Sequence, residues 1–546
     1  MKRIIVVYFF CMGLSAFAQT NYHIIFKDKG DTSISKPSDF LSARSILRRQ
    51  WQHIQVTYSD YPVCRNYLTK LCALGIKPII VSKWFNMITA VLTTEQYAAT
   101  ICLPFVEKVE PVKAGGGTCI TLEKQTDPFI PDYYGVPWYR HQLRITHTDV
   151  LNANRYRGEG KIIAVMDDGF MNIDKIKAFK HLFTENKILA VYDFVNNDSD
   201  VYSDGSHGTL VLSNIAAIAD NALYGGAYNA SFILCRTENN AIESRQEEEN
   251  WLMAAEYADS IGADVFSTSL GYSKGMTDSL EDYSYADMDG NTTIITRAAD
   301  MAASKGILVI NAAGNEGSGN WKYITAPSDG DSVLAVGAVD SIGIKTNFSS
   351  VGPSSDGRLK PELVTRGGRN YIVGTDGNIY QGSGTSFACP LISALATSLW
   401  SSKPEATAWQ IREALIQSAH QYNSPDTLLG YGIPDARTAF FLLHGYYLPE
   451  PVDSSELNHN GVGIYPNPAH NTIRIVFENR YLLKEVNVTI YDLYGRKIKA
   501  GMVELATDYN EYFLLFSVNG MNTGVYYISL TTANDIQLYQ LKLLIQ

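Results

Sequence analysis

Three side chains that together can activate a nucleophile, Asp167, His207 and Ser386, occur in that order along the chain. Their segments read IIAVMDDG, SHGTLV and GSGTSFACP. A serine hydroxyl is a poor nucleophile until a base accepts its proton, and the base works best when a carboxylate orients it. A fourth segment, NAAGNEG, places the amide of Asn315 between the histidine and the serine. These residue types in this order predict acyl transfer through a serine nucleophile.

Two of these residues follow predicted strands. From about residue 134 to residue 443, apolar strands alternate with helices, which is typical of a parallel sheet covered on both faces. Asp167 and Asn315 come just after strands, and ligands of such sheets lie beyond the carboxyl ends of the strands. The predicted strands are Ile162–Met166, Ile188–Tyr192, Ser231–Leu234, Val265–Ser269, Ile307–Asn311 and Val333–Val336, with helices that include Glu248–Ile261 and Thr293–Lys305.

Two predicted helices present the histidine and the serine. His207 opens a helical segment over residues 208–218, and Ser386 begins a helix that runs through Trp400. We expect Pro390 in the first turn of that helix, where a missing N–H is harmless. The positive end of the helix and the N–H of Ser386 would then stabilise negative charge on a substrate oxygen.

The order of the triad distinguishes three groups of enzymes: His-Asp-Ser in chymotrypsin-like folds, Ser-Asp-His in α/β-hydrolases and Asp-His-Ser in subtilisin-like folds. With all four segments in the third order, the chain resembles the subtilisin-like serine peptidases. The resemblance implies that Ser386 attacks the peptide carbonyl, His207 moves the proton, Asp167 orients it and Asn315 binds the oxyanion, with no cofactor. Asp168 stands where the family usually has Ser or Thr, and the alignment of the strand and Gly169 favours Asp167 as the residue that orients His207.

The resemblance also implies a peptide-binding cleft. One wall would pair with an extended peptide backbone, as in strand addition to a sheet edge. Thr325 is expected near the floor of the primary pocket, and the side-chain preference does not follow from the sequence. The residues of the two walls are Ser269, Leu270 and Gly271, and Ala312, Ala313 and Gly314.

Two segments precede the catalytic region. Basic residues, a short apolar run and an Ala-Phe-Ala site make residues 1–18 a secretory signal. Residues 19–117 contain the order strand, helix, helix, strand, helix, strand, with helices at Ser38–Gln50 and Cys64–Leu74, the first capped by Ser38. This small α/β unit resembles the inhibitory propeptides of subtilases in its position and element order. A permanent accessory domain is the alternative.

The end of the chain differs in character. After an irregular linker at residues 447–460, residues 461–546 hold short strands separated by turn residues, which is typical of a β-sandwich. The segments IYPNP, YDLYG and GVYY resemble the C-terminal sorting domains of the type IX secretion system of Bacteroidota. The resemblance implies export across the outer membrane, with the secretion machinery as a partner. A sandwich that binds carbohydrate or protein is the alternative.

Composition narrows the partners. The formal net charge of −11 and the lack of a basic stripe argue against nucleic acid. No stretch is long and apolar enough for a transmembrane anchor in the mature chain. Seven cysteines without a CxxC pair argue against a metal ribbon. A Cys64–Cys72 disulfide and buried free thiols both stay open.

Three charged segments lie outside the triad. We interpret Arg48-Arg49 as part of a solvated helix face. The acidic run formed by Glu238, Glu243 and Glu247–Glu249 is likewise interpreted as solvated surface. Residues 287–291 (DMDGN) have oxygen ligands at alternate positions, as in a calcium loop, but lack the distal bidentate Glu, so a plain turn is favoured.

Together, these features predict a secreted serine endopeptidase made as a zymogen, with a catalytic domain at residues 118–446 and protein or peptide substrates. The alternative from another class is a surface adhesion or binding protein with the same fold and no activity, which predicts a missing triad member. An esterase would carry a GxSxG elbow at its serine. The triad is complete and Ser386 lacks that elbow, so both alternatives are disfavoured.

Overall fold

The computed structural model describes residues 20–30, 36–112, 127–128, 142–219, 223–242, 244–274, 276, 279, 281–448, 462–465, 468–477, 485–504, 506–508, 511–531 and 537–545. The predicted signal at residues 1–18 and nearly all of the predicted linker lie outside the described residues. The chain forms two compact units, one of residues 1–148 and 156–443 and one of residues 149–155 and 444–546.

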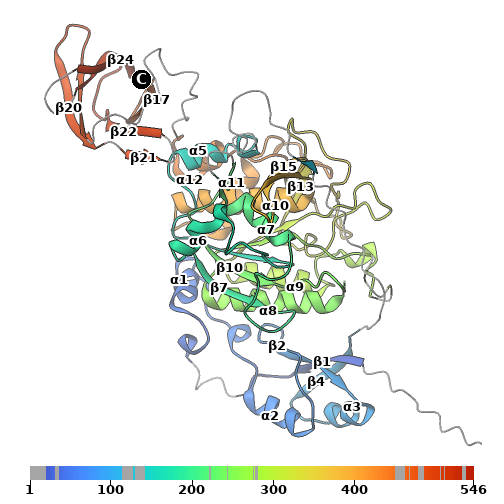
Figure 1. Cartoon of the computed structure of the whole chain (residues 1–546). Coiled ribbons are helices and arrows are strands. Elements are labelled where there is room, and N and C mark those ends of the chain that lie inside the picture. Colours follow the sequence, from blue (N-terminus) through green and yellow to red (C-terminus); the bar gives the residue numbers. More distant parts are fainter. Residues whose placement is uncertain are drawn as a thin grey trace, which may run out of the picture. The chain divides into compact units, whose positions relative to one another are not determined.

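A seven-stranded parallel sheet forms the centre of the first unit (Figure 1). The strand order is β14-β13-β12-β11-β6-β10-β7, and most of these strands are buried along their whole length. This confirms the predicted α/β fold; β14, an edge strand, was not predicted. The strands are β6 (Ile162–Asp167), β7 (Ile188–Asp193), β10 (Ser231–Arg236), β11 (Val265–Thr268), β12 (Leu308–Ala312), β13 (Leu334–Val339) and β14 (Leu363–Arg366).

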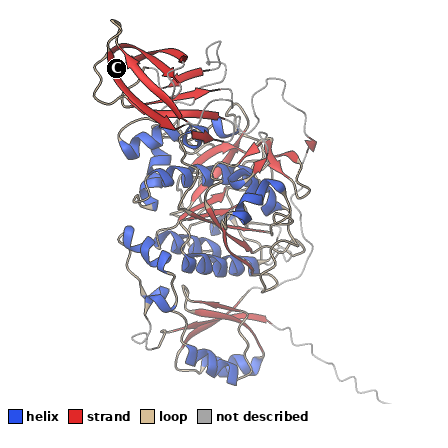
Figure 2. Cartoon of the chain, turned by 60° about the vertical axis from the view of Figure 1, so that its left-hand side comes forward, coloured by secondary structure: helices blue, strands red, loops and turns tan. Residues whose placement is uncertain are grey.

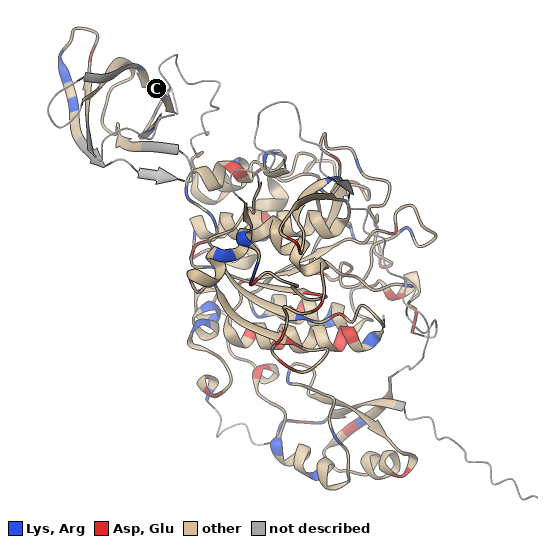
Figure 3. Ribbon diagram, in the orientation of Figure 1, with Lys and Arg blue, Asp and Glu red and all other residues tan. Residues whose placement is uncertain are grey.

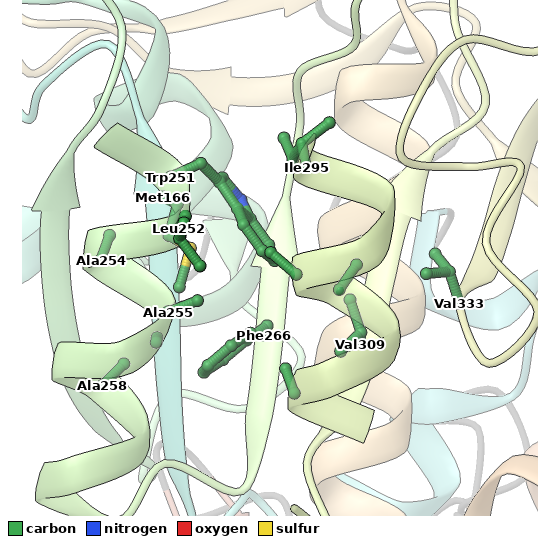
Figure 4. Close-up of a cluster of buried hydrophobic side chains, with 14 of the residues drawn as sticks. Met166, Trp251, Leu252, Ala254, Ala255, Ala258, Phe266, Ile295, Val309 and Val333 are labelled. Carbon is green, nitrogen blue, oxygen red and sulfur yellow. The ribbon is translucent and has the colours of Figure 1, made fainter. Parts of the chain in front are cut away.

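Helices cover both faces of this sheet (Figures 1 and 2). On one face α8 (Arg245–Ile261) packs beside α9 (Ile294–Ser304), and on the other α7 (His207–Ala216) packs beside α10 (Thr385–Ser402). Between α8, α9 and the sheet, the ring of Trp251 meets that of Phe266 edge-on at a centroid distance of 6.1 Å (Figure 4). Both rings are fully buried. This core holds α8 rigidly against the strands that carry the polar residues.

Smaller elements complete the first unit. Strands β15 and β16 form a hairpin that ends just before Ser386, and β5 pairs with β16. The bounds are β5 (Asp127–Pro128), β8 (Ile218–Ala219), β9 (Leu223–Tyr224), β15 (Asn370–Val373), β16 (Ile379–Gly382), α6 (Lys180–Thr184), α11 (Ala408–Gln417), α12 (Ala436–His444), η3 (Lys177–Phe179) and η4 (Tyr285–Asp287).

The N-terminal residues form a four-stranded antiparallel sheet with the order β2-β3-β1-β4. The first helix begins at Ala43, not at Ser38, because Ser42 accepts the N–H of Ser45 as the N-cap and residues 37–39 form a separate 3-10 turn. The elements are β1 (Thr20–Phe26), η1 (Pro37–Asp39), α1 (Ala43–Trp51), η2 (Tyr58–Asp60), α2 (Arg65–Ala73), β2 (Ile80–Ser82), β3 (Met87–Leu92), α3 (Thr94–Ile101) and β4 (Val106–Pro111).

Two charged segments that the sequence assigned to solvated surface are buried. Arg48 and Arg49 on α1 are each 1% exposed, because both pair with Asp259 on α8. The acidic residues at the start of α8, Glu247–Glu249, are at most 2% exposed. Tertiary packing explains most of these errors, since Arg48, Arg49, Glu248 and Glu249 each have a partner far away in the sequence. Glu247 instead accepts the nearby N–H groups of Asn239 and Ser244. Glu243 lies outside the described residues.

The second unit contains two four-stranded antiparallel sheets, β17-β18-β22-β21 and β20-β19-β23-β24. Buried side chains of both sheets, such as Ile475 and Ile528, share one apolar core, so the predicted β-sandwich is confirmed. All five predicted strands are present. The elements are α5 (Thr148–Ala153), β17 (Val462–Tyr465), β18 (Thr472–Phe477), β19 (Glu485–Tyr491), β20 (Lys497–Glu504), β21 (Ala506–Asp508), β22 (Glu511–Ser517), β23 (Gly524–Thr531) and β24 (Gln537–Ile545).

Neither a membrane helix nor a disulfide is found in the part of the chain that the structure describes. No helix there combines the length and the apolar character that a bilayer crossing needs. Cys64 and Cys72 are both free, so the disulfide considered from the sequence is not formed. Cys235 and Cys389 are buried free thiols, as the other interpretation expected, whereas Cys102 is exposed.

Candidate active site

Asp167 and His207 form a hydrogen-bonded pair at the carboxyl edge of the sheet. Asp167 is the last residue of β6 and is 2% exposed. Its Oδ1 accepts a hydrogen bond from Nδ1 of His207 at 2.7 Å and another from the N–H of Asp168 at 2.9 Å. Burial raises the pKa of the Asp167 carboxyl, and the nearby His207 opposes that rise. The pairing holds Nδ1 as the protonated nitrogen, which leaves Nε2 free to accept a proton.

Asp168 has a different partner from Asp167. Its Oδ1 accepts the N–H of Gly208 at 2.9 Å, and its Oδ2 accepts the N–H of His207 at 3.2 Å and the amide of Asn240 at 3.2 Å. Asp168 therefore caps the N-terminus of α7, the helix that His207 opens. The two adjacent aspartates thus have different partners: Asp167 contacts the ring of His207, and Asp168 contacts the backbone of His207 and Gly208. The contact with Asn240 had no signal in the sequence.

Ser386 lies near the start of α10 with 8% of its surface exposed. Its hydroxyl donates to the carbonyl of Ser269 at 3.2 Å, and the hydroxyl of Ser269 donates to the carbonyl of Ser386 at 3.0 Å. Pro390 lies inside α10, beyond the first turn, so its expected place was wrong. Because Pro390 has no N–H, it cannot bond the carbonyl of Ser386, four residues earlier, and Ser269 supplies that donor instead.

Packing between α7 and α10 brings the histidine and the serine to the same region. The ring of His207 lies 6.1 Å from the ring of Phe387, the neighbour of Ser386. Leu210 of α7, Phe387 of α10 and Ile372 of β15 share a small buried apolar cluster. Residues 179 positions apart in the chain (386 − 207) thus approach one another through their helices.

Asn315 lies beyond the end of β12 with its amide held in one orientation. Its Oδ1 accepts hydrogen bonds from the N–H of Thr385 at 2.9 Å and from the hydroxyl of Thr385 at 3.0 Å. A backbone N–H can only donate, so the Nδ2 group must face the other way. A Cβ placed on Gly384 would be in ordinary van der Waals contact with that Nδ2 and with the backbone nitrogen of Ser386, each at 3.7 Å. The two donors therefore flank the same position beside Gly384.

Thr325 lies between the two predicted walls of the cleft, next to Gly271 on one and Gly314 on the other. A Cβ on Gly271 would lie 2.1 Å from Oγ1 of Thr325, and one on Gly314 would lie 3.0 Å from the same atom. Tyr272 and Ala326 form a backbone bridge that holds these segments side by side. Thr325 is 3% exposed, and its hydroxyl has no hydrogen-bond partner among the described residues. Of the other wall residues, Ser269, Ala312 and Ala313 are buried, and Leu270 is half-buried.

In the candidate calcium loop, residues 287–291, the two aspartates accept hydrogen bonds from neighbouring residues. Asp289 accepts the N–H groups of Asn291 and Thr292, each at 2.8 Å, and Asp287 accepts the N–H and the hydroxyl of Ser284, each at 2.7 Å. Within the described residues, the one cluster of three or more potential metal ligands is Asp167, Asp168 and His207. That cluster is the hydrogen-bonded group described above.

Comparison with protein families identifies three segments. Residues 158–432 match the subtilase family. The matched segment covers half of the chain and includes Asp167, His207, Asn315 and Ser386. The chain belongs to the subtilase family. Residues 21–125 match the peptidase S8 propeptide domain of Bacteroidota, and residues 463–546 match the secretion system C-terminal sorting domain. The family makes the chain a serine endopeptidase, and the sorting domain indicates secretion to the cell surface or the extracellular space.

Individual subtilases agree with this assignment. Subtilisin DY of Bacillus licheniformis is 29% identical over 288 residues, which cover 52% of this chain and 90% of that protein. A thermophilic serine proteinase of Bacillus sp. (strain AK1) is 30% identical over 343 residues, which cover 60% and 76% of the two chains. The crystal structure of the epidermin leader peptide processing serine protease of Staphylococcus aureus has the same fold, with a TM-score of 0.53, 16% identity, and coverage of 78% of this chain and 99% of that one.

Proposed function

We propose that this subtilase cleaves peptide bonds with Ser386 as nucleophile, His207 as general base, Asp167 as the residue that orients it and Asn315 as an oxyanion donor. The observation that carries the proposal is the 2.7 Å hydrogen bond between Asp167 and His207, made at the sheet edge where Ser386 and Asn315 also lie. That bond fixes the tautomer in which Nε2 can take a proton.

The chemistry follows from these contacts. The Ser386 hydroxyl exchanges its weak bond to the carbonyl of Ser269 for one to Nε2 of His207, which takes the proton as Oγ attacks the substrate carbonyl. Nδ2 of Asn315 and the N–H of Ser386 then donate to the oxyanion beside Gly384. His207 returns the proton to the leaving amine, and water completes hydrolysis of the acyl-enzyme by the reverse steps. No cofactor takes part.

A small side chain fits the primary pocket best. Thr325 fills the space between Gly271 and Gly314, so the floor between the two walls is narrow. We expect small residues, such as alanine, immediately before the cleaved bond, and Thr325→Gly should shift the preference toward larger apolar residues. Profiling both enzymes on a peptide library tests this; equal profiles would remove Thr325 from the pocket.

The remaining segments complete a route from synthesis to release. We propose a signal at residues 1–18, an inhibitory propeptide at 19–117, the catalytic domain at 118–446, a linker at 447–460 and a type IX sorting domain at 461–546. The support is the family match of the propeptide and of the sorting domain, together with the antiparallel sandwich at the end of the chain. Residues 287–291 are proposed to be a turn that needs no calcium. Deletion of residues 461–546 should leave the enzyme in the periplasm; unchanged export would refute the sorting role.

One labelling experiment tests the catalytic proposal. A fluorophosphonate probe should modify the processed wild-type enzyme on Ser386, and Ser386→Ala should show no labelling. Peptide hydrolysis should fall about 10⁶-fold, the loss measured for the corresponding serine in subtilisin. Absence of labelling in correctly processed wild-type protein would refute the proposal, whereas Ser383→Ala, a change at the neighbouring exposed serine, should label normally.

A further inference from the structure

One segment of the propeptide contacts the catalytic region at the edge of the sheet opposite to the candidate active site. We call residues 36–60 the strap; it contains η1, α1 and η2 and lies in the chain between β1 and α2. The strap contacts Asp264, which directly precedes β11, and Gly306, which precedes β12. Strands of a parallel sheet all begin at one edge, so these contacts lie at the amino edge, whereas Asp167 ends its strand at the carboxyl edge.

Two buried arginines make the central contacts of the strap. Arg48 donates to Asp259 and to the carbonyl of Ala263. Arg49 donates to the other oxygen of Asp259 at 2.8 Å and to Asp60 of the strap at 2.8 Å. Asp259 and Asp60 are both 0% exposed. Lys305, just after α9, adds a fifth charge, because it is 2% exposed and pairs with Asp60 at 3.3 Å. A buried charge without its partner is costly, so the five charges hold the strap against the catalytic region as one set. Figure 3 shows the basic residues of α1 and the acidic residues of α8.

Backbone groups at helix ends add hydrogen bonds to the strap. Ser42 donates its N–H to the carbonyl of Ser260 at 2.9 Å and its hydroxyl to that of Ile261 at 2.6 Å, at the C-terminus of α8. The amide of Gln52 donates to the carbonyl of Gly306 at 2.7 Å and accepts the N–H of Ala408, the first residue of α11, at 2.8 Å. Helix ends leave such groups unpaired within the helix, so the strap satisfies polar groups of three catalytic-domain elements.

The rest of the propeptide docks separately. The turn after β2 binds Glu256 on α8, which accepts the Ser82 hydroxyl at 2.6 Å and the N–H groups of Lys83 at 3.0 Å and Trp84 at 2.9 Å. On β1, His23 contacts Glu249 at 2.5 Å. Sheet and strap thus bind different carboxylates of one helix, and neither set of contacts includes a triad residue.

We propose that the strap gives the propeptide a second docking surface on the catalytic domain, remote from the active site. The contacts of Arg48 and Arg49 then determine how fast the propeptide dissociates after it has been cleaved from the catalytic domain. The inference rests on the proposed function, because it assumes a propeptide that inhibits until it is released. A ligand with two attachments rebinds at one while held by the other, so it leaves far more slowly than either part alone. The strap therefore keeps the inhibitory region at high local concentration after the chain is cut.

The test uses the full chain with Ser386→Ala and an inserted recognition site for an added, sequence-specific protease between Gly115 and Gly117. After the cut, release of the propeptide from the immobilised catalytic part is followed over time. Arg48→Ala with Arg49→Ala should release it roughly 30-fold faster or more, the effect of truncating one side of a buried charge pair. The matched control, Arg65→Ala with Lys70→Ala, removes the same charge from the exposed face of α2 and should change release less than about twofold.

The release rates of the variants either support or overturn the role of Arg48 and Arg49. Equal release rates for the two double variants would overturn the proposal. If the alanine variant does not fold, Arg48→Lys with Arg49→Lys keeps the charges but loses the forked geometry, and it should still release the propeptide faster than the control. Release of the propeptide from the Ser386→Ala parent should change little at about 1 M salt, because buried pairs are weakly screened. This release experiment needs no catalysis. A failure of the separate fluorophosphonate labelling of processed wild-type enzyme would therefore refute the proposed function but not the role of the strap.

Discussion

Helix α8 carries buried carboxylates at both ends, and the two ends differ in how the charge is compensated. Glu248 in the first turn accepts the Tyr283 hydroxyl at 2.5 Å and the N–H of Ile295 at 3.2 Å, and burial raises its pKa to about 7. Asp259 in the last turn is equally buried. Burial alone would raise the pKa of Asp259, but Arg48 and Arg49 outweigh it and hold that pKa below its ordinary value.

The helix dipole opposes both shifts, because a negative charge is favourable near a helix N-terminus and unfavourable near its C-terminus. Burial therefore outweighs the dipole at Glu248, and the two arginines outweigh both burial and the dipole at Asp259. The same contrast holds for the two edges of the sheet. At the carboxyl edge, Oδ2 of Asp167 has no hydrogen-bond partner among the described residues, and Nδ2 of Asn315 lies near the position beside Gly384 that the backbone nitrogen of Ser386 also borders. At the amino edge, by contrast, the buried charges pair with charges of the strap. The contacts with the strap and the candidate catalytic residues therefore lie at different edges of the sheet.

The largest effect on stability is expected at the amino edge. Asp259→Ala should destabilise the Ser386→Ala precursor by about 3–5 kcal/mol, because it leaves two arginines buried without their carboxylate. The unfolding midpoint in urea measures this. Glu110→Ala, which breaks an exposed pair with Lys108, should cost less than about 1 kcal/mol. Similar losses for both variants would mean that the two arginines are solvated.

The next effect belongs to the carboxyl edge and should appear in catalysis alone. Asn315→Ala should lower kcat about 10²–10³-fold, the loss measured for the corresponding donor in subtilisin, with little change in KM. The unfolding midpoint should hardly move. Asn291→Ala removes an exposed amide from a turn and should leave kcat unchanged. A rise in KM at constant kcat would show that Asn315 binds the substrate and not the transition state.

The two ends of α8 should respond to pH with opposite signs. The pKa of Glu248 is about 7 when folded and 4.5 ordinarily, so the unfolded chain loses this proton first as the pH rises. Its contribution is therefore full below about pH 4.5 and is lost, by up to about 3 kcal/mol, as the pH approaches 7. Asp259 contributes above its ordinary pKa and loses that contribution as the pH falls.

Glu248→Gln isolates the first of these effects. In the Ser386→Ala precursor, the variant should lose less stability than its parent between pH 4.5 and pH 7, as measured by thermal unfolding. Asp259→Asn should instead flatten the acid side of the curve. Identical pH curves for Glu248→Gln and its parent would show that this carboxyl is charged in the fold.

The smallest effect tests the division between the two aspartates. Asp168→Ala removes the cap of α7 and should cost about 0.5–2 kcal/mol of stability. Asp168→Ser keeps a capping oxygen and should recover most of that loss. Asp167→Ala should impair catalysis far more than Asp168→Ala. The opposite order in a kcat comparison would exchange the roles of the two aspartates.

Most elements were predictable from local pattern. The strands of the parallel sheet that carry long Val and Ile runs were found within a few residues, as were α8, α9 and five strands of the sandwich. Five of the missed strands, β2, β14, β17, β20 and β21, lie at the edges of their sheets, whereas the missed strand β16 is the central strand of the small sheet β15-β16-β5. An edge strand is paired on one side only and is often short or charged, so its sequence pattern is weak. β20, for example, begins Lys497-Ile498-Lys499.

Charged residues were the least predictable. Arg48, Arg49, Glu248 and Glu249 look like solvated surface, because a charged side chain is buried only where another group pairs with it or hydrogen-bonds to it, and their partners lie on other elements. The place of Pro390 was misjudged for a related reason. A proline inside a helix is tolerated when another group bonds the freed carbonyl, and Ser269, 117 positions away from Ser386, does so.

The α/β fold, the family and the candidate residues Asp167, His207, Ser386 and Asn315 were all predictable without the structure. Each of these four residues stands in a short motif whose backbone geometry is local. The sequence favoured Asp167 over Asp168, but only the tertiary structure showed what Asp168 contacts, since that depends on which atoms of α7 each carboxylate meets. It also showed the strap, whose contacts join residues more than 200 positions apart. Distant charges meet through packing, and packing depends on the whole chain.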